Sequence, residues 1–90
     1  MNIIQLRAKI DEVDNQIIQL LEKRISLAIQ IGRLRGSAKQ DESRELDVIR
    51  RLAAANEESR LSDQAIAAIW QCIFEHSRKA QASSLATIKS

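Results

Sequence analysis

Two arginines occupy helix positions where leucine-like residues are expected. Apolar residues recur in steps of three and four from Leu6 to Leu34, and Arg24 fills the one gap in that series. Arg35 follows eleven residues later, which is about three helical turns and roughly 16 Å along the same face. An inward arginine needs an anionic partner, because an unpaired buried charge is strongly unfavourable. The alternative is that Arg24 lies along the surface beside a neighbouring carboxylate, an arrangement of little energetic value.

The last apolar stripe of the chain ends in two polar residues. We expect one helix to hold Ile66, Ile69, Trp70, Ile73 and Phe74 inside, and Ser77 and Gln81 continue the line of Ile66, Trp70 and Ile73. Buried polar side chains need hydrogen-bonding partners; the alternative is that this end of the helix is exposed. Taken together, two arginines and two neutral hydrogen-bonding groups on inward faces predict a polar pocket lined by cations.

A third arginine, Arg7, lies too far from Arg24 to share that pocket within one chain. The two are separated by about 25 Å along a single helix. If two such helices pair antiparallel and cross near residue 18, Arg7 of one chain meets the stretch between Arg24 and Arg35 of the other. A surface position for Arg7 is the alternative, but this geometry favours a site shared between two chains.

Three helices would position these side chains. The chain has no proline, two glycines and few aromatic residues, a composition that favours helices over strands. The apolar seam predicts a helix over residues 3–35, ended by Gly36. A second helix should begin near Asp41 or Ser43 and a third after Ser62, because these side chains are good N-caps.

The first helix is too long for a compact domain of 90 residues. It would span about 50 Å, whereas such a domain is about 30 Å across. Its protruding apolar seam needs cover, and the simplest partner is a second copy of the chain. We therefore predict an all-α fold with three helices per chain, intertwined into a six-helix homodimeric bundle. Residues 1–81 form this domain, and residues 82–90, where apolar residues thin out, form a frayed tail.

Composition narrows the partners further. The chain is 44% hydrophobic and 29% charged, a soluble globular balance, and its net charge of +2 comes from interspersed signs rather than the basic stripe typical of nucleic-acid binding. No apolar run reaches the about 18 residues of a membrane span. Cys72, the single cysteine, is expected to be buried and suits a reducing compartment, so we expect a cytoplasmic protein. His76 has no Cys or His cluster around it, so no metal site is expected.

Read in order, three stretches resemble the all-helical chorismate mutase family: LRAKIDEVDNQIIQLLEKRISLAIQIGRLR, DESRELDVIRRL and IFEHSRKAQ. The family's pattern matches Leu6-Arg7, Ile10-Asp11…Asp14, Leu20-Leu21…Arg24, Ile31-Gly32…Arg35, Asp41…Arg44-Glu45 and Ser77…Gln81. The resemblance covers roughly residues 5 to 81. No single piece is distinctive, but their order and spacing together are.

The resemblance implies a reaction that needs little from the protein in the way of reactive groups. The family rearranges chorismate to prephenate, a unimolecular pericyclic shift in which an ether C–O bond breaks as a C–C bond forms. No nucleophile, general base, metal or cofactor takes part, so none is expected here. The site must instead fold the substrate into its reactive conformer and stabilise charge on the ether oxygen.

The resemblance also assigns the anion contacts. Chorismate is a dianion, and arginine grips carboxylates bidentately. Arg7 from the partner chain and Arg24 are expected to hold the two carboxylates. Arg44 and Ser77 complete these contacts.

The remaining assignments concern the reacting oxygen and the ring. Arg35 and Gln81 are expected to reach the ether oxygen, while Glu45 and the backbone near Asp41 take the ring hydroxyl. Arg33, in the same loop region as Arg35, should face solvent.

One departure from the family pattern bears on substrate choice. The family usually has lysine where this chain has Arg35, and arginine is longer, planar and differently aimed. Lys39 could reach the ether oxygen instead. Related enzymes of this fold act on isochorismate as pyruvate lyases or on an amino analogue of chorismate, and both remain alternatives. An alternative of another class is a non-enzymatic helical dimerisation module, which would give the inward arginines no task.

Overall fold

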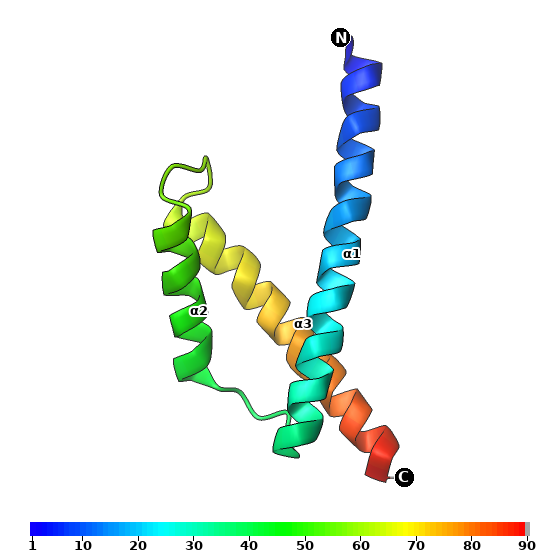
Figure 1. Cartoon of the computed structure of the whole chain (residues 1–90), viewed down its shortest axis with the longest axis vertical. Helices are drawn as coiled ribbons and strands as arrows, with labels where there is room; N and C mark the ends of the chain where they lie inside the picture. The colour runs from blue at the N-terminus through cyan, green and yellow to red at the C-terminus, as the bar shows by residue number, and fades with distance from the viewer. Residues whose placement is uncertain (90) are drawn as a thin grey trace.

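The computed structural model describes residues 1–89 and consists of three α-helices. Helix α1 spans Ile3–Arg35, α2 spans Glu42–Ala55 and α3 spans Asp63–Lys89. Figure 1 shows α1 as a long rod, with α3 crossing its C-terminal half and α2 beside the start of α3. The predicted all-α fold of three helices is confirmed.

Local capping explains where the helices begin and end. Gly36 ends α1 in the left-handed conformation (φ 67°), and the N–H groups of Gly36 and Ser37 donate to the carbonyls of Arg33 and Gly32, a Schellman arrangement. The Asp41 side chain accepts from the Arg44 N–H at 3.1 Å and caps α2. The first turn of α3 is capped in the same way by Ser62, whose Oγ accepts from the Ala65 N–H at 3.1 Å. These three boundaries are those predicted from the sequence.

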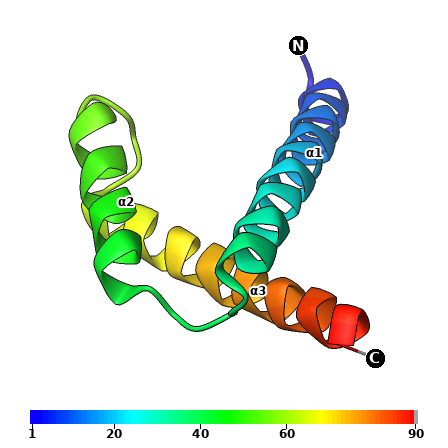
Figure 2. The same ribbon diagram turned by 60° about the horizontal axis from the view of Figure 1, so that its bottom comes forward.

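The helices form an open frame with α3 as its base. In Figure 2, α1 and α2 rise from α3 as two separate arms. Among the described residues, α1 and α2 each pack on α3, but no Cα of α1 lies within 8 Å of a Cα of α2. The chain measures 53 × 29 × 15 Å and its radius of gyration is 16.2 Å, against about 12 Å for a compact domain of this length. The first helix protrudes as predicted.

Little apolar surface is buried within the chain. Among the described residues, only Ile66 and Phe74 form a buried hydrophobic core, both on α3. Two predictions about α3 are wrong: Ile69 and Cys72, expected inside, are exposed. Both line an apolar cleft between α3 and the middle of α1 that this chain leaves open. No helix in the described part of the chain is long and apolar enough to cross a membrane.

The end of α3 extends further than its apolar pattern indicates. The helix continues through residues 82–89, where the sequence predicted a loss of order, and Arg33 Nε donates to Ser84 Oγ at 2.9 Å. This contact ties the extension to the last turn of α1. Fraying of this segment remains a prediction, and Ser90 lies outside the described residues.

Candidate active site

A cavity of about 360 Å³ lies between the C-terminal half of α1, the start of α2 and the second half of α3. It is lined by Arg24, Leu27, Ala28, Ile31, Arg35, Lys39, Asp41, Arg44, Glu45, Val48, Phe74, Ser77, Arg78 and Gln81. Seven of the eight residues singled out from the sequence are in this set. They come from all three helices and from the loop that joins the first two.

The eighth residue, Arg7, is far from the cavity of its own chain. It lies near the N-terminal end of α1, on the exposed part of the helix. This position is the one expected of a residue that acts in another chain's site. Its contribution to such a site remains a prediction.

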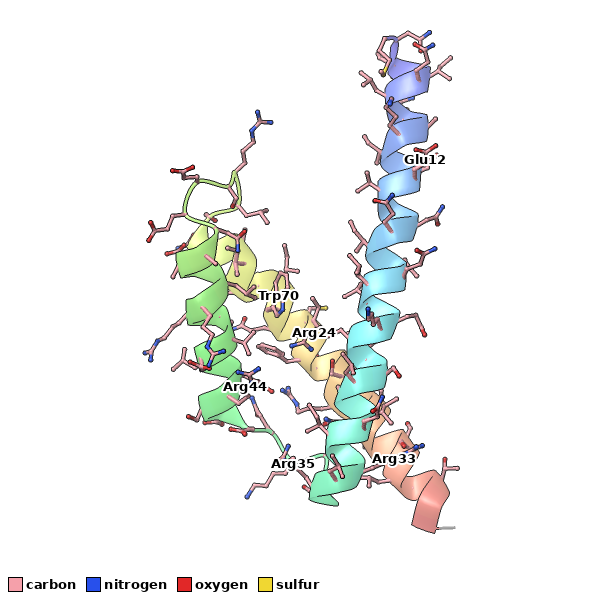
Figure 3. All side chains as sticks on the ribbon, viewed as in Figure 1. Glu12, Arg24, Arg33, Arg35, Arg44 and Trp70 are labelled. Atoms are coloured by element: carbon pink, nitrogen blue, oxygen red, sulfur yellow. The ribbon has the colours of Figure 1, made fainter. Side chains whose placement is uncertain are left out.

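The cavity is strongly cationic. Its lining carries five basic side chains and two carboxylates, a formal charge of +3: Arg24, Arg35, Lys39, Arg44 and Arg78 against Asp41 and Glu45. Figure 3 shows Arg24, Arg35 and Arg44 directed into the space between α1 and α2, with Arg33 on the other side of α1. An anion of two or three charges is the ligand that such a lining suits.

Arg24 is half-buried where α1 meets α3. Its guanidinium carbon is 5.3 Å from the centre of the Phe74 ring, a cation–π contact across the α1–α3 interface. Burial lowers the pKa of Arg24, and the nearby charge of Arg44 lowers it further, while the Glu45 carboxylate opposes both. Arginine remains charged at neutral pH even so. A partly desolvated cation of this kind binds a carboxylate more strongly than a fully hydrated one.

The two arginines before Gly36 point to different places. The Arg35 guanidinium donates from Nη2 to the backbone oxygen of Lys39 at 3.3 Å, so the loop holds it at the cavity wall. Both arginines are exposed, but Arg33 lies on the other side of α1, where its Nε donates to Ser84 Oγ. Both Arg35 and Lys39 line the cavity, so the geometry leaves two cations available where the family pattern has one lysine.

Gln81 and Ser77 are buried at the crossing of α3 with α1. Gln81 Nε2 donates to the backbone oxygen of Ala28 at 2.7 Å, which fixes the orientation of its amide. An amide nitrogen has two hydrogens, so one N–H remains for the cavity. Ser77 Oγ donates to the Ile73 carbonyl at 2.8 Å, which leaves its oxygen lone pairs available.

Close helix packing makes this placement possible. A Cβ added at Gly32 of α1 would come within 3.0 Å of Gln81 Cγ and 3.2 Å of its Cβ. Glycine at this position therefore lets α3 approach closely enough for the Gln81 amide to reach the α1 backbone.

Glu45 is held from two sides. Its Oε2 accepts from Nη1 of Arg78 on α3, and its Oε1 accepts from Gln40 Nε2 at 3.0 Å. Sequence reasoning missed Arg78, although a signal was present: it lies three residues before Gln81 and so shares part of its helix face.

Arg44 lies at the rim of the cavity rather than inside it. Its Nη1 pairs with Asp47 Oδ2 at 3.2 Å, and Asp47 also pairs with Arg51 at 3.1 Å. Asp41 caps α2, so its side chain positions the backbone at the cavity mouth. No three His, Cys, Asp or Glu side chains gather as a potential metal site within residues 1–89.

Residues 6–82 match the family described as chorismate mutase type II. Since the match spans most of the chain, the protein belongs to the type II chorismate mutase family and is an enzyme of the isomerase class. The chain is similar to a protein named chorismate mutase from Methanocaldococcus jannaschii. The two are 30% identical over 80 residues, which cover 86% of this chain and 81% of the relative. No solved structure matches the chain.

Proposed function

We propose that the protein rearranges chorismate to prephenate in the cationic cavity, as a homodimer in which each site receives Arg7 from the other chain. The observation that carries this proposal is the gathering of seven family-matched residues from three helices around one cavity of charge +3. Chorismate is a dianion, and the family membership supports the same reaction.

The proposed mechanism is restraint plus electrostatic stabilisation. Arg24 and the second copy's Arg7 hold the two carboxylates, which folds the substrate into its reactive conformer. As the ether C–O bond breaks, negative charge grows on the oxygen. Arg35 and the free N–H of Gln81 donate to that oxygen. Arg44 and Ser77 complete the carboxylate contacts.

The ring hydroxyl has its own acceptor in this scheme. Glu45 accepts from it, together with the backbone beside Asp41. The pericyclic step then needs no proton transfer by the protein, so Glu45 orients the ring rather than acting as a base.

The apolar surface that a single chain leaves exposed supports the dimer. Every residue from 3 to 20 of α1 is exposed, including the apolar seam at Leu6, Ile10, Val13, Ile17 and Leu20. A second, largely apolar cleft of about 860 Å³ lies between the middle of α1 and α3, beside Trp70 (Figure 3). Apolar surfaces of this extent are characteristic of interfaces, and a second α1 supplies a matching seam.

A product assay tests the proposal. The purified protein is incubated with chorismate and, separately, with isochorismate, in the presence of EDTA, and the products are identified by chromatography and mass spectrometry. Prephenate from chorismate is the expected result. Pyruvate release from isochorismate, with no turnover of chorismate, would instead assign the lyase reaction known in related enzymes of this fold.

A further inference from the structure

Arg78 is a charged residue of the cavity wall to which the proposed mechanism gives no task. It projects from α3 into the cavity, and its Nη1 donates to Oε2 of Glu45 on α2. The Arg78 side chain is 29% exposed and that of Glu45 is 19% exposed. Because both are largely removed from water, the pair is screened less than an ion pair on the open surface.

The contacts of Glu45 limit what this carboxylate can offer a ligand. Arg78 engages Oε2, and the Gln40 amide engages Oε1 at 3.0 Å. Each oxygen has a second lone pair, so Glu45 can still accept a hydrogen bond from a neutral donor. Its negative charge, however, is balanced by Arg78 and faces Arg24 as well.

We infer that Arg78 determines specificity: by neutralising Glu45, it makes the site accept a ring hydroxyl and reject a ring ammonium. This inference rests on the proposed function, in which Glu45 receives the substituent of the ring. A hydroxyl needs only a free acceptor lone pair. An ammonium also needs uncompensated negative charge and would lie beside the like charge of Arg78, which repels it.

The test compares chorismate with 4-amino-4-deoxychorismate, which carries an amino group at that ring position. We would measure kcat/KM for chorismate and the inhibition constant of the amino analogue against chorismate, for the unchanged protein and for Arg78→Met. Removing the positive charge should favour the analogue by about tenfold relative to chorismate. Arg78→Lys, which keeps the charge, should leave the preference near that of the unchanged protein.

Lys79→Met is the matched control. Lys79 neighbours Arg78 in the sequence, is 67% exposed and pairs with Glu75 instead of a cavity residue. The substitution removes the same charge one residue away and should leave the preference unchanged. If Lys79→Met shifts the preference as much as Arg78→Met, net charge explains the effect and the inference is wrong.

Glu45→Gln supplies an independent arm with the opposite sign. It leaves the charge of Arg78 unbalanced, so the amino analogue should bind less well relative to chorismate. If the preference for chorismate over the amino analogue is unchanged in Arg78→Met, the inference is wrong. If Arg78→Met does not fold, a preference that is unchanged or weakened in Glu45→Gln overturns the inference instead. An unchanged protein that makes no prephenate would refute the proposed function itself, a distinct result.

Discussion

The two halves of α1 share one apolar periodicity but lie in opposite surroundings. Residues 3–20 contact no other helix closely enough to be covered, and all of them are exposed. Residues 21–35 cross α3, bury Gly32 against Gln81 and contribute Arg24 and Arg35 to the cavity. A periodic apolar face therefore indicates that a helix will be covered. Which part of the helix is covered within its own chain depends on where another helix of that chain crosses it.

The largest effect is expected from charges placed in the uncovered half. Ile10 and Val13 are 57% and 50% exposed, so Ile10→Asp combined with Val13→Asp costs little in one isolated chain. In a dimer the same change buries two unpaired carboxylates, which is strongly unfavourable. We expect dissociation, loss of helix content and loss of activity by at least about 100-fold, as measured by sedimentation, circular dichroism and assay.

The control for this experiment is Ala8→Asp combined with Asn15→Asp, which adds two carboxylates on the opposite face of the same segment. It should sediment and act like the unchanged protein. A stable, folded and active species of 10.2 kDa for the unchanged chain would contradict the dimer and the shared site together.

The second prediction joins the two halves of α1. Arg7→Ala and Arg24→Ala should each be inactive alone, because in the proposed dimer each removes a carboxylate contact from both sites. After subunit exchange, a mixed dimer has one intact site and one site that lacks both arginines. An equimolar mixture, half of it mixed dimers, should recover about a quarter of wild-type activity. Mixtures that exchange subunits, as shown by mass spectrometry, yet stay inactive would place both arginines in one chain.

The third prediction separates the arginines at the end of the covered half. Removing a fixed donor from developing charge typically costs about 10²–10³ in rate, so Arg35→Ala should lose at least that much in kcat. Arg33→Ala, which removes only the contact with Ser84, should change kcat little. If Lys39→Ala is instead the damaging substitution and Arg35→Ala is mild, the lysine is the ether-oxygen donor.

The fourth prediction concerns the close approach of α1 and α3. In Gly32→Ala the new Cβ would meet Gln81 Cγ at 3.0 Å, so the glutamine must move. The helix gains about 1 kcal/mol from alanine in place of glycine, which offsets the strain, so the melting temperature should change by only a few degrees. The displaced amide should lower kcat about tenfold. If the loss of activity is explained entirely by a loss of folded protein, Gln81 acts only in packing.

The smallest effect is expected from pH. The proposed mechanism uses no general acid or base, so kcat should be nearly flat from about pH 5 to 9. The lowered pKa of Arg24 means that its charged form is disfavoured on folding, a penalty present below that pKa and relieved as pH rises through it. That relief falls in the strongly alkaline range, because the pKa of arginine is very high even when burial lowers it. A bell-shaped profile centred near pH 7 would contradict the electrostatic assignment.

Local signals predicted the helices well and tertiary pairings less well. Gly36, Asp41 and Ser62 act within a few residues of themselves, so their capping roles follow from chain chemistry alone. Seven of the residues that line the cavity could be named from the sequence, because they match the order and spacing of the family's pattern. Arg78 was missed because its task depends on how α2 packs against α3. Cys72 was assigned to the interior because its apolar neighbours give no sign that the cleft beside it stays open within one chain.

Because α1 and α2 make no contact among the described residues, a substrate bound as proposed would also have a mechanical role. A dianion gripped by Arg24 from one arm and Arg44 from the other would be a direct link between these two helices, which otherwise communicate through α3 and the loop of residues 36–41. The bound reactant would therefore restrict the movement of α1 relative to α2. When the product leaves, this link between α1 and α2 would be lost.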